Sequence, residues 1–266
     1  MDKKYKLTKE TINVNGKTLY RIEALKDFSD VKQGDKGGFV EKESNLSQYG
    51  NCWVYDDAKI YDDAKVYDNA SIFDNAWVYD YAVVSCDAKV YDDAIVCGRA
   101  IVFDNAEIYG DAEVNGNAKV YYNAKVYGNA EVYGHAVILH DVEVYGHALV
   151  FGNAAVFGDA KVYGDAEVYD DAAVFGDAQV YGDAAVCGET RICDDAVVCA
   201  NSDYILFKNW WSSGRFFTWT KSNNMWKVGC FYGTGKELVE KAYKDSEISG
   251  REYERVVKYV EAIMRE

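Results

Sequence analysis

A six-residue hydrophobic period dominates the chain. Residues 54–203 form 25 consecutive hexads, and every hexad begins with Val or Ile. The fifth position is Ala in 22 hexads, and the exceptions are Val142, Thr190 and Ser202. The second position is Tyr or Phe in 18 hexads, and the third and fourth positions are mostly Asp, Asn or Gly. Because the phase never slips, these residues repeat one small structural unit.

This period predicts a parallel β-helix in which each hexad supplies a short strand and a corner. Val or Ile would fill the interior, and only a small side chain fits inside the corner. Asp, Asn and Gly suit the corner because they tolerate turn and left-handed backbone conformations. Three hexads per coil would bring strands of successive coils into register, about 4.8 Å apart along the axis. A β-meander needs other turn residues, and the period fits no α-helix.

The hexads resemble the hexapeptide repeat of left-handed β-helices of the acyltransferase type, although their second position is aromatic. A further motif precedes the repeat and consists of Asp27, Phe28, Val31, Gly34, Gly37, Gly38, Val40, Leu46, Ser47, Gly50, Cys52, Trp53 and Tyr55. This motif resembles the entry segment of the YdcK-like hexapeptide-repeat proteins, which are uncharacterised bacterial and phage-associated proteins. The resemblance implies a left-handed β-helix and implies no activity.

The two ends of the chain lack the period. Asn15-Gly16 between apolar runs predicts a β-hairpin. Residues 204–211 and 215–233 read as strands with a polar turn at 222–224, and residues 236–247 and 249–266 read as amphipathic helices, the second capped by Ser249. Open solenoid ends expose strand edges, so both ends are expected to be caps. We predict a mainly β chain with an N-terminal hairpin and cap (1–53), a hexapeptide-repeat β-helix (54–203) and a small α+β C-terminal domain (204–266).

The net negative charge of the chain lies in the repeat. The chain has 266 residues and a net charge of −15, but residues 54–203 alone carry 28 acidic and 8 basic residues, a net charge of −20. The remaining residues carry a net charge of +5. Eight coils at about 4.8 Å make a rod of roughly 40 Å, with about one net charge per 2 Å, against one per 1.7 Å in duplex DNA.

This charge density suggests a nucleic-acid mimic that binds a basic nucleic-acid-binding protein, as a phage inhibitor of host defence of the anti-CRISPR kind would. Direct nucleic-acid binding by the β-helix is not expected. The candidate partner-binding residues are the corner acids Asp56, Asp57, Asp62, Asp63, Asp92, Asp93, Asp170, Asp171, Asp194 and Asp195. The alternatives are a passive scaffold, in which the acids serve solubility, an acyltransferase-like enzyme, and a nucleotide-binding sponge with a basic cleft at the positively charged ends.

Reading every third hexad separates three faces. Face one carries an aromatic column and, at the preceding position, charges of alternating sign from Lys89 to Lys161. Face two is mixed. Face three is apolar, and only Lys119 is charged in its central run. We therefore expect face three to be an interface, either between copies in a homo-oligomer or with the C-terminal domain folded back. Its candidate interface residues are Val83, Ile101, Phe103, Val137, Leu139, Phe157 and Phe175.

Candidate catalytic chemistry is sparse. An acyltransferase would need a base from His135, His140 or His147, but His135 and His147 lie two hexads apart, on different corners, and no loop interrupts the coils. Cys187, Cys193 and Cys199 would face three directions, whereas zinc ligands converge. The Asp corners lack a calcium loop, and Gly229–Lys236 departs from the phosphate-binding loop. We predict no catalytic residue, no metal and no cofactor.

Two further expectations concern location and the C-terminal domain. No apolar run suits an export signal or a membrane span, and the seven cysteines are read as reduced thiols, so a cytoplasmic protein is expected, in the host cell if it is phage-encoded. The C-terminal domain offers a second candidate binding surface, because hot spots are rich in aromatic side chains. Its residues are Trp210, Trp211, Phe217, Trp219 and Trp226.

Overall fold

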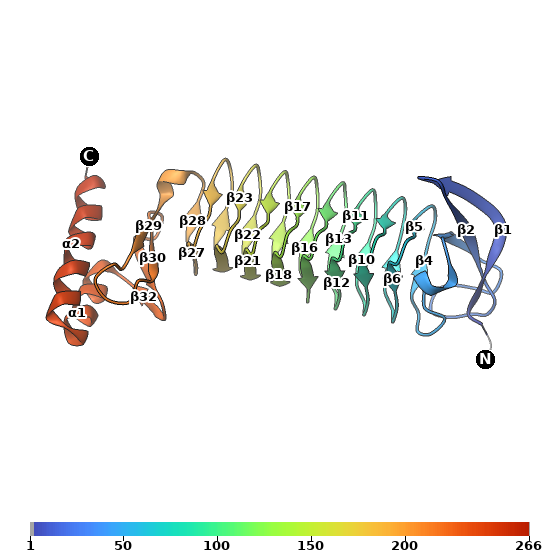
Figure 1. The fold of residues 1–266 in the computed structure, drawn as a ribbon, viewed down its shortest axis with the longest axis horizontal. Coiled ribbons are helices and arrows are strands. Elements are labelled where there is room, and N and C mark those ends of the chain that lie inside the picture. The colour runs from blue at the N-terminus through green and yellow to red at the C-terminus, as the bar shows by residue number, and fades with distance from the viewer. Residues whose placement is uncertain (1–2, 266) are drawn as a thin grey trace.

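The computed structural model describes residues 3–265 as a straight triangular rod with a cap at each end (Figure 1). The rod is a left-handed parallel β-helix of about nine coils, which confirms the predicted fold class. Each hexad contributes one short strand, and three hexads complete a coil. Strands 18 residues apart pair in parallel, as in Lys89↔Glu107↔Lys125.

The three faces are three parallel sheets. Face one consists of β4 (Trp53–Val54), β7 (Ser71–Ile72), β10 (Lys89–Val90), β13 (Glu107–Ile108), β16 (Lys125–Val126), β19 (Glu143–Val144), β22 (Lys161–Val162), β25 (Gln179–Val180) and β28 (Val197–Val198). Face two consists of β5 (Lys59–Ile60), β8 (Trp77–Val78), β11 (Ile95–Val96), β14 (Glu113–Val114), β17 (Glu131–Val132), β20 (Leu149–Val150), β23 (Glu167–Val168) and β26 (Ala185–Val186). Face three consists of β6 (Lys65–Val66), β9 (Val83–Val84), β12 (Ile101–Val102), β15 (Lys119–Tyr121), β18 (Val137–His140), β21 (Ala155–Gly158), β24 (Ala173–Gly176) and β27 (Arg191–Ile192).

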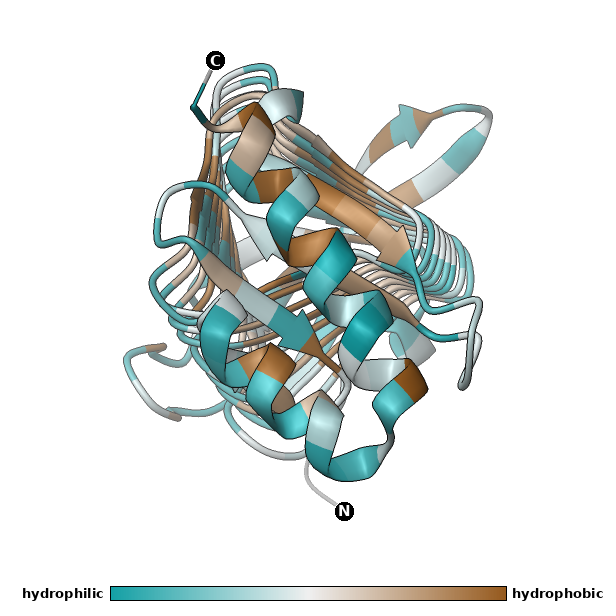
Figure 2. Cartoon of the chain, turned by 90° about the vertical axis from the view of Figure 1, so that its left-hand side faces the viewer, coloured by the Kyte–Doolittle hydropathy of each residue, from teal (hydrophilic) through white to brown (hydrophobic). Residues whose placement is uncertain are grey.

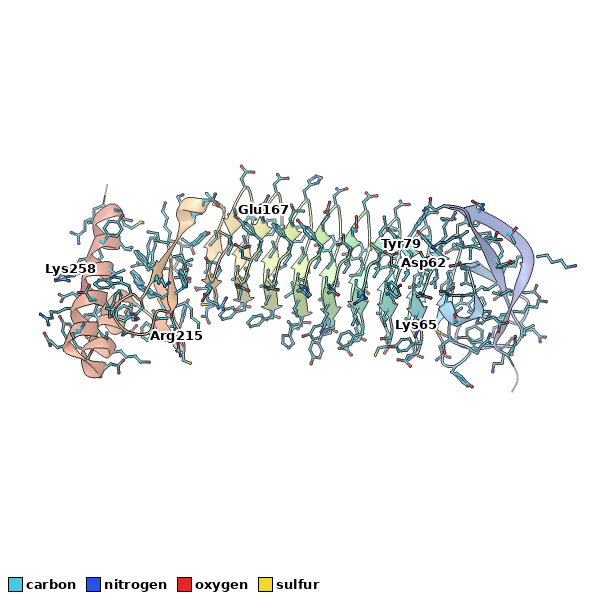
Figure 3. The ribbon with its side chains drawn as sticks, in the orientation of Figure 1. Asp62, Lys65, Tyr79, Glu167, Arg215 and Lys258 are labelled. Atoms are coloured by element: carbon cyan, nitrogen blue, oxygen red, sulfur yellow. The ribbon has the colours of Figure 1, made fainter. Side chains whose placement is uncertain are left out.

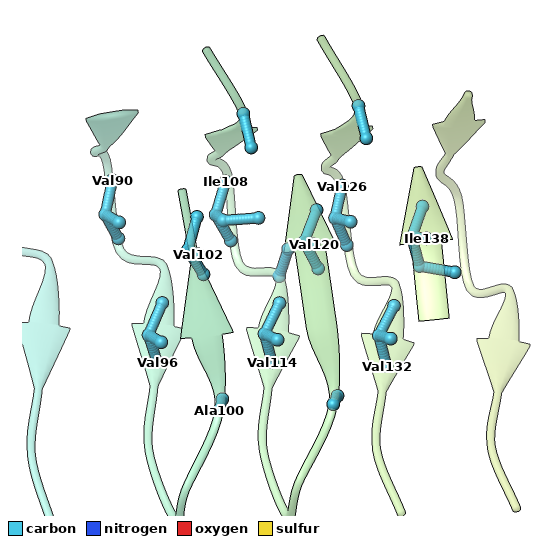
Figure 4. Close-up of a cluster of buried hydrophobic side chains, with 14 of the residues drawn as sticks. Val90, Val96, Ala100, Val102, Ile108, Val114, Val120, Val126, Val132 and Ile138 are labelled. Carbon is cyan, nitrogen blue, oxygen red and sulfur yellow. The ribbon is translucent and has the colours of Figure 1, made fainter. Parts of the chain in front are cut away.

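The interior of the rod is one continuous apolar core. Every Val or Ile at a first position is at most 1 % exposed, and the alanines at the fifth position are equally buried. Figure 4 shows how the side chains of successive coils stack, with Val102, Val120 and Ile138 in one column. Branched side chains fill the faces, while alanine leaves room for the backbone to turn at each corner.

The third residue of each hexad makes the corner. Asp at this position has a positive φ, for example 59° at Asp92, and Gly takes over the same role in other coils, as at Gly116 with φ 67°. Asn and Asp reach the left-handed region at lower cost than other side chains. Tyr122 and His140 adopt the same conformation, so the surrounding coils impose it on them as well.

The N-terminal cap begins with a hairpin and ends as an irregular coil. The predicted hairpin is confirmed as β1 (Tyr5–Val14) and β2 (Lys17–Ala24), joined at Asn15-Gly16 with φ of 51° and 82°. β3 (Lys36–Val40) then pairs with β5, Leu46 forms a parallel bridge to Val66, and a short 3-10 turn (Glu43–Asn45) lies between them. The first coil of the β-helix therefore begins near residue 40, inside the stretch predicted as cap.

Part of face two is covered by this hairpin. Val14, Leu19 and Phe39 form a small core with Tyr61, against which Trp77 and Tyr79 also pack. Trp77 and Tyr79, on the outer surface of face two, are thus partly buried at this end of the rod.

The C-terminal domain is a four-stranded antiparallel sheet covered by two helices (Figure 2). The strands are β29 (Tyr204–Lys208), β30 (Phe216–Thr220), β31 (Met225–Val228) and β32 (Phe231–Gly233), and the helices are α1 (Gly235–Asp245) and α2 (Glu247–Ile263). Thr234 and Glu237 form a capping box at α1. The predicted cap of the second helix was wrong: Ser246 caps α2, and its hydroxyl accepts a hydrogen bond from the N–H of Ser249 at 3.1 Å. No helix of residues 3–265 is long and apolar enough to cross a bilayer.

Candidate functional site

The acidic residues of the rod lie along its three edges. Of the 28 acids in residues 54–203, 22 occupy third or fourth hexad positions, where the chain turns between faces. The ten predicted partner-binding acids do not form one surface. Asp56, Asp57, Asp92 and Asp93 lie on the edge after face one (edge one), Asp62, Asp63, Asp170 and Asp171 on the edge after face two (edge two), and Asp194 and Asp195 on the edge after face three (edge three).

Third-position carboxylates have a structural role. The Asp92 carboxylate accepts a hydrogen bond from the N–H of Gly110 at 3.0 Å, and Asp170 accepts one from Gly188 at 3.3 Å. Asp56 likewise accepts from the N–H of Asp74 at 3.4 Å. In each case the donor lies one coil further along the rod. Half of the predicted set is therefore at the position that ties successive corners together, which reduces its availability to a partner.

Four of the predicted acids form ion pairs or hydrogen bonds with residues of the two caps. Arg21 reaches Asp57 at 3.0 Å, Lys17 pairs with Asp62, and the ammonium of Lys42 lies 2.8 Å from Asp63. The hydrogen bond from Lys42 holds the pKa of Asp63 below its usual value. At the other end, the side-chain amide of Asn223 donates to Asp195 at 2.8 Å. These contacts anchor the caps to the edges.

Between the caps, edge one carries acids that make no such contacts. Its fourth-position carboxylates are exposed, and among the residues that the structure describes none has a cation within 4 Å. They lie parallel to the rod axis as two pairs on successive coils, separated by the two coils that carry Asn129 and His147 at the same position. The residues are Asp93, Asp111, Asp165 and Asp183.

Face one carries a stacked tyrosine ladder beside alternating charges. From Tyr91 to Tyr181 the rings of successive coils stack at 4.8–4.9 Å, and the largest angle between neighbouring planes is 8°. The predicted charge alternation is confirmed in register, with Lys161 3.0 Å from Glu143 and Lys89 3.4 Å from Glu107. The hydroxyl of Tyr127 donates to Glu143 at 2.8 Å.

The tyrosine ladder predicts a marked alkaline pH dependence. Burial raises the pKa of Tyr91 and Tyr109, and burial together with the bond to Glu143 raises the pKa of Tyr127. The neutral ring is therefore favoured by folding. This stabilisation is complete below the unfolded pKa of about 10 and is lost as pH rises toward the folded values. Ultraviolet titration of tyrosinate should show most ladder tyrosines ionising only when the protein unfolds. Ionisation of all tyrosines near pH 10 in the folded state would contradict this expectation.

The predicted interface on face three is only partly covered. Val83, Ile101, Phe103, Val137 and Leu139 are half-buried on the outer surface of the rod. Phe157 and Phe175 lie nearer the C-terminal domain, and the ammonium of Lys227 lies 5.5 Å from the ring centre of Phe175. This contact agrees with the expectation that the C-terminal domain meets this face. Self-association through the remaining residues stays a prediction.

The three histidines are not brought together. His140 stacks on Tyr122 at 4.9 Å on edge three, and His147 lies on edge one. His135, on edge two, borders a hollow of about 500 Å³ that also contacts Asn153, Glu189 and Phe216. Among residues 3–265 no three His, Cys, Asp or Glu side chains converge as a metal site.

The proposed aromatic surface of the C-terminal domain needs correction. Phe217, Trp219 and Trp226 are each 1 % exposed and form the domain core with α1 and α2. They are buried because the sheet turns these side chains toward the helices. Trp211 is half-buried against Tyr253, and Trp210 is 73 % exposed.

Comparison with known proteins gives one short match. The uncharacterized acetyltransferase YdcK of Escherichia coli (strain K12) is 50 % identical over 38 residues, which is 14 % of this chain. The chain matches only 12 % of the length of that relative. No family model matches the sequence. The match and the coiled architecture support a hexapeptide-repeat β-helix.

Proposed function

We propose that the protein is a non-enzymatic binding protein whose edge one engages a basic, nucleic-acid-handling protein. The observation that carries this proposal is the set of exposed fourth-position carboxylates of edge one, Asp93, Asp111, Asp165 and Asp183, which have no cation within 4 Å among the described residues. Their rigid spacing supports it, because successive coils are about 4.8 Å apart and the β-helix cannot relax locally. These four carboxylates are spread over five coil spacings, about 24 Å, so the charge density that resembles a duplex is that of the whole rod around them.

The test is displacement of duplex DNA from a basic protein. A labelled duplex bound to purified linker histone would be titrated with the full chain at about 50 mM and about 200 mM salt. We expect displacement at low salt that weakens strongly at high salt. Neutralising four exposed acids at roughly 0.5 kcal/mol each should raise the concentration needed about 30-fold. The substitutions are Asp93→Asn, Asp111→Asn, Asp165→Asn and Asp183→Asn.

These substitutions should leave the fold intact, because edge one already carries Asn75 and Asn129 at the same hexad position. A matched control removes the same charge from α1 and α2, with Glu240→Gln, Asp245→Asn, Glu247→Gln and Glu261→Gln. The control should displace DNA like the native chain. If both variants lost displacement equally, displacement would depend on net charge alone, and the proposal of a specific edge would be wrong.

A second candidate function is acetyl transfer. The name of the E. coli relative, an uncharacterized acetyltransferase, suggests it, and the placement of His135 at a hollow favours it. In this case His135 would act as the base, and the edge-one acids would be dispensable.

A further inference from the structure

A larger hollow lies where face three meets the C-terminal domain. It adjoins the hollow at His135 and shares Asn153, Asp171, Glu189 and Phe216 with it. It encloses about 750 Å³, a volume suited to a small organic ligand. Its floor is the outer surface of β21 and β24, and its other walls come from β27 and from residues next to β30 and β31. Figure 3 shows Arg215 at this junction, beside the end of the rod.

The floor of this cleft is flat and apolar. Phe157 and Phe175 stack at 4.8 Å with their planes 2° apart. Ala155 and Ala173 precede them at the sixth hexad position, where the preceding coils of the same face carry Lys119 and Val137. Small side chains at this position lower the surface locally, so a planar group can lie against the floor.

Three cations border the floor without an acidic partner. Arg191, Arg215 and Lys227 all line the cleft, and within residues 3–265 no carboxylate lies within 4 Å of any of them. One Arg191 nitrogen donates to the backbone oxygen of Asp171 at 2.7 Å, and its remaining donors are available. Arg191 comes from the acidic rod, and Arg215 and Lys227 come from the C-terminal domain, which carries a net charge of +3. The three cations together suit an anionic ligand.

The side of the floor along edge two is acidic and lies opposite Lys227, which contacts the Phe175 ring. Arg191 reaches this acidic side through its bond to the backbone of Asp171. Asp171 and Glu189 line the cleft on edge two, and Asn153 donates to Asp171 at 3.0 Å. A compact anion such as sulfate would gain from the cations but would be repelled by these carboxylates. A ligand with hydroxyl or amino donors at one end and negative charge at the other uses both sides. The strand from Asp171 to Phe175 separates the two sides by about 13 Å.

We propose that this cleft binds a nucleoside phosphate. The planar base packs on the alanine and phenylalanine floor, and Asp171 and Glu189 accept hydrogen bonds from ribose hydroxyls or a base amino group. Arg215 and Lys227 hold the phosphates, while Arg191 stays bonded to the backbone of Asp171. The site goes beyond the acidic-edge function and does not depend on it. The only candidate partner-binding acid that it uses is Asp171, which is not among the residues of the edge-one test.

The test is calorimetric titration of the full chain with ADP, and separately with adenosine and with inorganic pyrophosphate. We expect ADP to bind at least tenfold more tightly than either half, because the two halves use opposite sides of the cleft. The double variant Arg215→Gln and Lys227→Gln should weaken ADP at least tenfold. The variant Ala155→Ile, which introduces a residue that the same column carries at Ile101, should weaken ADP and leave pyrophosphate unchanged.

A control pair, Lys236→Gln and Lys244→Gln, removes the same charge from exposed positions on α1 and should bind ADP like the native chain. Unchanged thermal midpoints would show that all variants are folded. The proposal is overturned if ADP does not bind at millimolar concentration, if pyrophosphate binds as tightly as ADP, or if the control pair loses as much affinity as the cleft pair. Failure here with DNA displacement intact would leave the acidic-edge function standing, and the reverse result would leave the cleft standing.

Discussion

Replacing Val120 by Asp is expected to destabilise the protein by about 4 kcal/mol or more, whereas the same substitution at the adjacent Lys119 should be nearly neutral. Val120 is fully buried between Val102 and Ile138, and no polar partner faces it. Lys119 points outward on the same strand and is exposed. Because side chains alternate along a strand, Val120 points into the interior and the adjacent Lys119 points into solvent.

Urea unfolding followed by circular dichroism measures both variants. In Val120→Asp we also expect amide exchange to accelerate first in the coils next to β15, since each coil contacts only its neighbours. Lys119→Asp serves as the matched control, because its cross-strand neighbours Ile101 and Val137 carry no charge. Similar midpoints for the two variants would show that the interior is not packed as described.

Replacing Lys4 by Ala is expected to cost about 3 kcal/mol. The Lys4 side chain is fully buried in the N-terminal cap, and its ammonium donates to the backbone oxygen of Cys52 at 2.8 Å and to those of Tyr49 and Gly50 at 3.4 Å. It also lies 5.2 Å from the ring centre of Phe28. Burial lowers the pKa of Lys4. Removing the side chain leaves carbonyl groups without this donor and opens a cavity.

The variant Lys4→Met separates these two effects, because Met retains most of the volume and no donor. We expect it to lose about 1–2 kcal/mol, less than Lys4→Ala. Chemical denaturation of both variants gives the comparison. If Lys4→Met proved as stable as the native chain, the hydrogen bonds of the ammonium would contribute no net free energy.

The fold of the rod could be predicted from its sequence because one residue type decides each position. A branched side chain at every first position and alanine at most fifth positions are all buried together only when each hexad forms one strand and one corner of a β-helix. The beginning of the rod could not be predicted, because Leu46 and Val54 are eight residues apart and the six-residue phase is broken there. The pairing of Val40 with Ile60 and the bridge from Leu46 to Val66 show that a coil has already formed there.

The candidate sites were less accessible to sequence reasoning. The hydrogen bond from Gly110 to Asp92 joins residues 18 apart, and composition cannot distinguish this role from a free acidic corner. Trp219 and Trp226 lie opposite each other in a sheet whose buried side depends on where the helices pack. The cleft could not be predicted, because it forms only where the C-terminal domain places Arg215 beside face three. A signal was present in Ala155 and Ala173, which interrupt a column of larger side chains.

The distribution of charge has a consequence for how copies of the rod meet. The N-terminal 53 residues carry a net charge of +2 and residues 204–266 carry +3, while the length between them carries −20. Two rods approaching tip to tip therefore repel each other, as do two rods lying side by side. A tip approaching a flank is attracted. β-Solenoids that stack tip to tip grow into fibrils. The positive net charge of both ends opposes this growth as long as the salt concentration is low enough for the Debye length to exceed a few ångströms.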